Sequence, residues 1–204
     1  MRISFRAKLV KFPNETNHPR GWNTDISHER KARSYEVETN WYQSFNRPII
    51  HAKIPKLIQQ GELQGKEKFL ILEDLTVLGF SPKARISNTQ IELCLKWLAN
   101  FHSHYLNVEP RKLWPTGTYW HLETRPDEFK AMKDEELKRT AHLIVQKLNS
   151  SRYKTIVHGD AKIANFLFKE NEVAAVDFQY VGGGVGIKDV AYFLSSIYGE
   201  QELY

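Results

Sequence analysis

The segment between residues 155 and 179 constrains the fold more than any other part of the chain. It contains His158-Gly-Asp160-Ala-Lys162-Ile-Ala-Asn165-Phe, and an apolar Val-Ala-Ala-Val run then leads into Asp177. The alternation of short apolar stretches with polar residues predicts a strand, a loop and a two-stranded hairpin, with strands at 155–158, 165–168 and 173–176. An acid and an amide would then lie in a loop and a second acid at a strand end, where a rigid scaffold presents polar groups to a ligand.

The spacing of these residues is that of a kinase catalytic loop, H-x-D-x-x-x-x-N, followed by a metal-binding Asp on the next hairpin. Asp160 is the candidate base that orients and deprotonates an acceptor hydroxyl. Asn165 and Asp177 are candidate magnesium ligands, because this ion takes one or two oxygen ligands from a protein and the others from phosphate and water. Lys162 is a candidate to neutralise the transferring phosphoryl group. The structural alternatives are an Asx-turn, a turn residue, a strand-end cap and a solvated lysine.

Three nearby features have structural interpretations. His158 is expected to brace the loop by hydrogen bonding and not to titrate in catalysis. Asp189 either caps the last helix or braces the catalytic loop, both structural roles. Gly182–Gly186 resembles a phosphate loop only superficially, because no GK[ST] follows it, and we expect a flexible segment there.

Composition excludes several other classes of protein. The net charge of +5 is spread along the 204 residues without a Lys/Arg block, so a nucleic-acid-binding module is poorly supported. The single cysteine, Cys94, excludes an internal disulfide and a multi-cysteine zinc site. The first residues are too polar for a signal peptide, and no apolar run reaches membrane-spanning length. We therefore expect a cytoplasmic protein without a membrane or nucleic-acid partner.

The rest of the chain predicts a mixed fold. A strand at 3–12 precedes a helix at about 27–45, and a boundary near Asp74–Pro82 separates a smaller lobe, residues 1–76, from a helical lobe, residues 77–204. The further predicted elements are strands at 54–59 and 68–74 and helices at 88–105, about 127–149 and 188–198. Asn88 or Thr89 is the expected cap of the strongly amphipathic helix at 88–105.

A nucleotide kinase needs a strand lysine on the phosphates and a helix glutamate that orients it. Glu38 shares the apolar stripe of its helix with Tyr42, and a buried carboxylate requires a cationic partner. Lys11 is the favoured lysine because Leu9 shares its face of the strand and would pack under the adenine. Lys8 is the alternative.

Two further segments are candidates for ligand contact. The apolar run Phe69–Leu75 resembles a strand leading into a linker between lobes, and backbone groups near Glu73 and Leu75 would bind the adenine edge; a plain buried strand fits the same residues. The loop with Trp114, Tyr119 and Trp120 is either a hydrophobic lid or a wall of an acceptor pocket. The second interpretation favours a moderately apolar, hydroxylated acceptor.

The motifs HGDAKIANFLF, AVDFQ and GIKDVAYFL resemble the aminoglycoside phosphotransferase and choline kinase-like superfamily. Within it they are most similar to the ecdysteroid kinase-like branch, as are the helix sequence ETNWY and the linker sequence LEDL. The resemblance covers about residues 5–198. It implies an α+β, protein-kinase-like fold of two lobes that uses ATP and Mg²⁺ to phosphorylate a hydroxyl of a small molecule.

The same resemblance assigns roles to particular residues. Asp160 would be the base, Asn165 and Asp177 the magnesium ligands, and Lys11 with Glu38 the phosphate-orienting pair. Such kinases begin with two further strands joined by a phosphate-covering loop and continue with more helices, so the first lobe is expected to be truncated and the second incomplete. The alternative to an active kinase is therefore a catalytically silent nucleotide- or ligand-binding fragment. The oligomeric state is left open.

Overall fold

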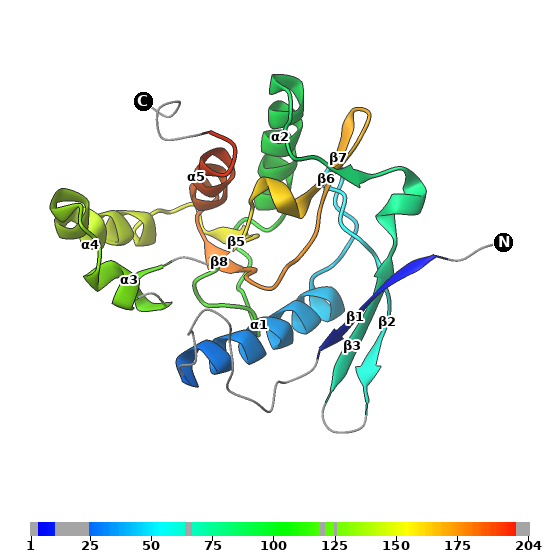
Figure 1. Ribbon diagram of the computed structural model, residues 1–204, viewed down its shortest axis with the longest axis horizontal. Helices are drawn as coiled ribbons and strands as arrows, with labels where there is room; N and C mark the ends of the chain where they lie inside the picture. The colour runs from blue at the N-terminus through cyan, green and yellow to red at the C-terminus, as the bar shows by residue number, and fades with distance from the viewer. Residues whose placement is uncertain (1–3, 11–24, 64–66, 119–120, 125, 199–204) are drawn as a thin grey trace.

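The computed structural model describes residues 4–10, 25–63, 67–118, 121–124 and 126–198. Figure 1 shows a three-stranded sheet on one side of the molecule, helices α3 and α4 on the opposite side, and the remaining helices and strands between them. Within the described residues, no helix combines the length and the apolar character needed to cross a lipid bilayer.

The N-terminal part consists of one antiparallel sheet and one long helix. The sheet has the order β1-β3-β2, and α1 lies beside it (Figure 1). The bounds are β1 Phe5–Val10, α1 Asp25–Ser44, β2 Leu57–Glu62 and β3 Lys68–Glu73. These elements confirm the strands and the helix expected from the alternating and helical patterns. Lys8 of β1 pairs in register with Leu70 of β3, whose side chain is buried, so this face of β1 points towards the interior.

The second part contains two small sheets and the helices around them. One sheet has the order β4-β6-β7, the other pairs β5 with β8, and all of these pairs are antiparallel. The bounds are β4 Ser81–Pro82, α2 Asn88–His104, β5 Thr155–Val157, β6 Phe166–Lys169, β7 Glu172–Ala175, β8 Gly182–Gly184 and α5 Ile187–Ser195. Short 3-10 helices lie at Leu75–Leu78, Leu122–Thr124 and Ile163–Asn165. The predicted strand, loop and hairpin around Asp160 are thereby confirmed.

Two helix boundaries differ from the sequence prediction. Ser87 caps α2, and its side chain and that of Gln90 form a reciprocal capping box, one residue before the expected caps. The helix predicted at about 127–149 is two helices, α3 (Pro126–Lys130) and α4 (Glu135–Asn149). The Asp134 side chain accepts a hydrogen bond from the backbone N–H of Leu137 and starts α4. The apolar periodicity of the sequence continues across the Asp134 cap, so it does not reveal that the predicted helix is broken there.

The expectation of a flexible segment at Gly182–Gly186 is wrong. Residues 182–184 form β8, which pairs with β5 along one side. On the other side of β8, Gly182 forms an isolated parallel bridge with Trp114. The backbone N–H of Gly183 donates to the carbonyl of Trp114 over 2.9 Å, and the N–H of Gly117 donates to that of Gly183 over 2.7 Å. A Cβ atom on Gly182 would collide with the Trp114 carbonyl oxygen, so glycine is required for close backbone approach, not for mobility.

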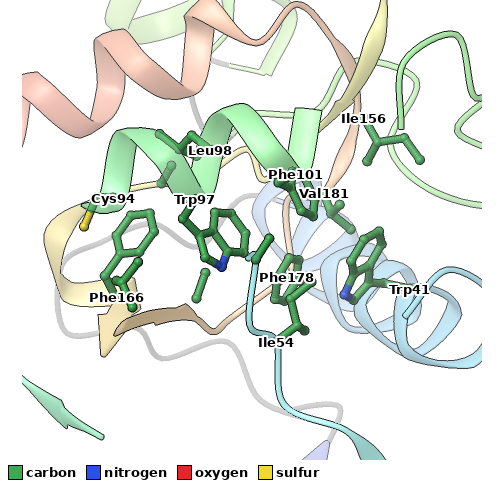
Figure 2. Packing of buried hydrophobic residues seen from close by; sticks show 14 of the residues in the cluster. Trp41, Ile54, Cys94, Trp97, Leu98, Phe101, Ile156, Phe166, Phe178 and Val181 are labelled. Atoms are coloured by element: carbon green, nitrogen blue, oxygen red, sulfur yellow. The ribbon is translucent and has the colours of Figure 1, made fainter. Parts of the chain in front are cut away.

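An aromatic core joins the two parts of the molecule (Figure 2). Trp41 of α1 stacks on Phe178, which follows the second acid of the catalytic segment, with ring centroids 4.8 Å apart. Trp97 of α2 stacks on Phe101 at 4.9 Å, and its indole N–H donates to the carbonyl of Lys53 over 2.9 Å. Each fully buried aromatic side chain contributes about 1.5–3 kcal/mol. The loop that carries the acids is therefore anchored from both sides by rigid packing.

Candidate active site

Asp160 lies buried at the start of the catalytic loop, and its two carboxylate oxygens have different surroundings. Oδ2 accepts hydrogen bonds from Lys162 Nζ over 2.8 Å and from Asn165 Nδ2 over 2.9 Å. Oδ1 is buried and has no hydrogen-bond partner among the residues that the structure describes. One oxygen is thus fixed and the other is left to accept a proton or a hydrogen bond.

Asn165 connects the first acid to the second. Its side-chain Nδ2 donates to the backbone carbonyl of Asp160 over 2.7 Å as well as to the carboxylate, which leaves its Oδ1 as the group able to bind a cation. Its own carbonyl accepts from the N–H of Val176 over 2.9 Å, which brings it next to Asp177. The structure therefore brings together three of the residues predicted from the sequence.

Asp177 follows β7 with a φ angle of 66°, in the left-handed region that aspartate tolerates better than most residues. Its side chain is 40% exposed, and Oδ1 lies 3.4 Å from Lys8 Nζ. The carboxylate thus points away from the core, towards solvent and towards the lysine of β1. Such geometry suits a ligand of an exchangeable cation better than a buried structural group.

Asp189, the buried acid of α5, holds the loop in place. Its carboxylate accepts from the backbone N–H groups of His158 over 2.7 Å and Gly159 over 2.9 Å. The ring nitrogen Nε2 of His102 lies 2.8 Å from the same carboxylate. Burial alone would raise the pKa of Asp189, but the bond and charge of His102, with the other partners, hold that pKa below its usual value. The bracing alternative for Asp189 is thus the one that the geometry gives.

The two histidines around this brace are structural in the described geometry. His158 places its Nε2 3.0 Å from the carbonyl oxygen of Val176, so it links the two halves of the catalytic segment as expected. His102 was missed in the sequence. The available signal was its position in the last turn of α2, four residues after Leu98, on the buried side of an amphipathic helix.

Glu38 is buried on the inner face of α1, and its partner is Lys8, with Nζ 2.6 Å from Oε2. The sequence favoured Lys11, which lies outside the described residues. The preference rested on Leu9, but Leu9 is 48% exposed and lies on the face of β1 opposite to Lys8. The alternative lysine therefore makes the ion pair. Alternation along a strand defines two faces, and only packing decides which of them is inside.

Lys8 lies between two carboxylates. Burial acts to lower the pKa of Lys8, but the charges of Glu38 and Asp177 outweigh it and raise that pKa. Burial raises the pKa of the Glu38 carboxyl, and the charge of Lys8 opposes this. The hydroxyl of Tyr42 is buried close to both acids, and burial followed by their charges raises its pKa well above the ordinary value. Lys8 is thus a firmly charged group held next to a predicted metal ligand.

The predicted linker residues already make bonds inside the protein. The carboxylate of Glu73 accepts from Lys53 Nζ over 2.8 Å, and its backbone N–H donates to the carbonyl of Lys56 over 2.9 Å. The carbonyl of Leu75 accepts from the N–H of Phe80 over 3.1 Å, and its side chain is buried. An adenine edge would therefore have to use the other backbone groups of this segment.

The aromatic loop is described only in part, because Tyr119 and Trp120 lie outside the described residues. Trp114 stacks on Tyr180 with centroids 6.3 Å apart, and its indole N–H donates to the carbonyl of Gln179 over 2.8 Å. Trp114 thus supports the segment after Asp177. Whether the loop forms a wall of an acceptor pocket stays a prediction.

Comparison with known proteins agrees with this geometry. The model of the phosphotransferase enzyme family APH matches residues 17–203, which is most of the chain. The chain belongs to this family. No curated protein matches.

Solved structures of the family share the fold. The GDP complex of wild-type aminoglycoside 2'-phosphotransferase-IIIa superposes with a TM-score of 0.54 at 15% identity, over 82% of this chain and 63% of that chain. Aminoglycoside phosphotransferase APH(4)-Ia superposes with a TM-score of 0.51 at 13% identity, over 78% of this chain and 59% of that one. The chain therefore has the mixed α/β, kinase-like fold of the family and spans about three fifths of the length of these relatives.

Proposed function

We propose that the protein is an ATP-dependent phosphotransferase that phosphorylates a hydroxyl of a small molecule, with Asp160 as the base. The observation that carries this proposal is that Oδ1 of Asp160 is buried and has no partner among the described residues, whereas Oδ2 accepts two hydrogen bonds. A carboxylate held in this way presents a single acceptor in a fixed direction, which is the geometry that a general base requires. Membership of a phosphotransferase family supports the type of reaction.

The chain's own residues supply orientation and charge. Oδ1 of Asp160 accepts the hydrogen bond of the acceptor hydroxyl and then its proton as the hydroxyl oxygen attacks the terminal phosphorus of ATP. The bond from that phosphorus to the bridging oxygen breaks, and ADP leaves with the electron pair. Lys162, whose side chain is 41% exposed, binds Oδ2 and stands where its charge can also meet the transferring phosphoryl group. Asp189 keeps the backbone of His158 and Gly159 fixed, and so prevents the base from moving away from its acceptor.

The donor set fits one magnesium ion and the phosphates of a nucleotide. Among the described residues no three His, Cys, Asp or Glu side chains gather as a metal site, which agrees with an ion held by Asn165 and Asp177 together with phosphate and water. When bound, the ion neutralises charge on the phosphoryl oxygens. Lys8, oriented by Glu38, is the residue that would bind the phosphates, in place of Lys11. The backbone near Glu73 and Leu75 would hold the adenine.

The finer assignments rest on the sequence resemblance. The ecdysteroid kinase-like branch and the aromatic rings of the loop around Trp114 favour a moderately apolar alcohol as the acceptor. The division into lobes at residues 1–76 and 77–204 would place the nucleotide between them. A cytoplasmic location, without a nucleic-acid or membrane partner, fits a kinase of small metabolites.

The alternative function is that of a catalytically silent protein of the same fold, which binds a nucleotide or ligand without turning it over. Nucleotide binding without phosphoryl transfer to any acceptor would favour this function.

The test separates binding from transfer. The protein is incubated with terminally labelled ATP, magnesium and a panel of hydroxylated metabolites, and ATP affinity is measured in parallel. Asp160→Asn should lower transfer by roughly 10²- to 10⁴-fold with little change in ATP affinity, because the base contacts the acceptor and not the nucleotide. Asp127→Asn, an exposed acid of α3, is the matched control and should change neither quantity. Equal loss of binding and transfer in the Asp160 variant would make this residue structural.

A further inference from the structure

A cavity of about 240 Å³ lies at the end of the β5–β8 ladder that is farther from the catalytic loop. Thr155 and Gly184, which are paired in register, line it, whereas Val157 and Gly182 at the other end lead to the base. Two residues of strand, roughly 7 Å, therefore separate the cavity from the start of the catalytic loop. It is distinct from the site of Asp160. Its other lining residues are Val108, Pro110, Pro115, Thr116, Leu148, Asn149, Lys154, Gly183, Val185 and Lys188.

Lys188, in the first turn of α5, is half-buried at this cavity. Its Nζ makes one long hydrogen bond, 3.4 Å, to the carbonyl of Gly117. The carboxylate of its neighbour Asp189 is turned towards His102 and the catalytic loop, and among the described residues Lys188 forms no ion pair. Burial lowers the pKa of Lys188; the charge of Asp189 opposes this, and the charge of Lys154 adds to the lowering. The cavity leaves space for an anion beside Lys188, and an anionic partner would stabilise this partly buried charge.

Lys154, the second lysine that lines the cavity, is hydrogen-bonded to the backbone of α4. Its Nζ donates to the carbonyl of Leu148 over 3.0 Å and to that of Asn149 over 2.7 Å, at the C-terminal end of α4. It therefore offsets the negative end of that helix. The charge of Lys188 is offset in part by that of Asp189 but has no ion pair among the described residues, and the N-terminus of α5 adds to the positive potential in the cavity.

The other residues that line the cavity indicate the size and polarity of a ligand that would fit it. Val108, Pro110, Pro115, Leu148 and Val185 give an apolar surface, and the hydroxyl of Thr116 adds a hydrogen-bonding group. The volume is below the roughly 300–1,000 Å³ of pockets for drug-sized ligands, so a small molecule fits. Apolar walls with one cation select a compact carbon skeleton that carries an oxyanion.

We propose that this cavity binds a small organic anion, a carboxylate or a phosphate monoester, through Lys188. The site is separate from the catalytic loop and does not depend on the kinase function proposed above. An ammonium group binds either kind of oxyanion as a point charge, so the shared chemistry is a charge-assisted hydrogen bond to a negative oxygen.

The experiment uses three probes on the full chain, with binding followed by NMR. Benzoate combines an apolar ring with a carboxylate, benzamide is its neutral counterpart, and inorganic phosphate tests the other oxyanion. Benzoate or phosphate should bind, and the one that binds more tightly identifies the oxyanion. Lys188→Met should weaken that binding by about tenfold or more, because it removes a charge-assisted bond. Binding should also raise the pKa of Lys188 in the wild-type protein.

Two variants serve as controls. Lys188→Arg should keep part of the affinity, and Lys147→Met, an exposed lysine of the last turn of α4 outside the lining, should keep all of it. Melting curves establish that each variant is folded. The proposal is overturned if neither benzoate nor phosphate binds, if benzamide binds as tightly as benzoate, or if folded Lys188→Met retains wild-type affinity.

Discussion

The catalytic loop and the first strand hold their charged groups in different ways. Around Asp160 the contacts that hold the backbone are buried: Asp189 binds the N–H groups of His158 and Gly159, and Phe166 directly after the loop is fully buried. On β1, Lys8 is held by Glu38 at the inner face, while Leu9 beside it is 48% exposed. In the sheet order β1 is an edge strand. The side of the site that carries Asp160 is thus fixed by the core, and the side that carries Lys8 is fixed by one strand and one ion pair.

This difference predicts that Asp160 keeps its place under conditions in which Lys8 moves. Regions with few buried contacts open locally at lower free energy than the core. Amide hydrogen exchange should therefore be faster in β1 than in β5 and in the loop after it. Equal protection of the two regions would contradict the comparison.

The largest effect is expected at the brace. Asp189→Ala should lower the free energy of unfolding by about 3–5 kcal/mol, because it leaves buried donors of His158, Gly159 and His102 without a partner. Urea denaturation at pH 7 measures this loss. Ser195→Ala, an exposed position of the same helix, is the control and should stay close to wild type.

The contribution of Asp189 also has a defined pH dependence. Its pKa in the folded state is depressed, so its stabilisation is fully present above the unfolded pKa of about 3.9 and is lost as pH falls through the folded value. The stability difference between wild type and Asp189→Asn should be constant from about pH 7 to pH 5 and shrink below about pH 4. If the difference in unfolding free energy grew on acidification, the pKa of Asp189 would be raised, and not lowered, in the folded state.

An intermediate effect is expected at the ion pair, and the two partners should differ. Lys8→Met leaves the Glu38 carboxylate buried, with its side chain only 2% exposed, and should cost about 1–3 kcal/mol. Glu38→Gln leaves an ammonium group that is 32% exposed and should cost less. Denaturation curves of both variants and of the double variant give the coupling energy. If Glu38→Gln lowered the free energy of unfolding more than Lys8→Met, the ammonium group of Lys8, and not the carboxylate of Glu38, would be the costlier charge to leave without its partner.

The smallest effect is expected on the outer face of the same strand. Leu9→Ala should change the free energy of unfolding by about 0.5 kcal/mol or less, because surface positions away from special contacts tolerate change. Phe166→Ala, fully buried next to the catalytic loop, should cost about 3–5 kcal/mol and is the matched core variant. Similar costs at the two positions would remove the contrast between the two regions.

The local arrangement of the candidate site residues could be predicted from the sequence. The spacing between Asp160, Asn165 and Asp177 is short enough that one strand, loop and hairpin determines how they meet, and the structure brings them together as expected. The periodic patterns likewise indicated six of the strands, β1, β2, β3, β5, β6 and β7, and the helices α1, α2 and α5 within a few residues. The family resemblance at the superfamily level is confirmed, whereas the ecdysteroid kinase-like branch stays a prediction.

Other features depended on contacts between distant segments, and only the tertiary structure decided them. Lys8 was chosen over the favoured lysine because the packing of β1 on β3 and α1 determines which face is inside. Gly182–Gly184 forms a strand because β5 pairs with it on one side and residues 114–117 approach it on the other, both across a long sequence separation. Within the described part of the chain, Oδ1 of Asp160 has no hydrogen-bond partner and Lys188 has no ion pair, and both follow from what surrounds these groups in space. Spacing along the chain specifies which groups are neighbours locally, but burial and partners are properties of the packed core.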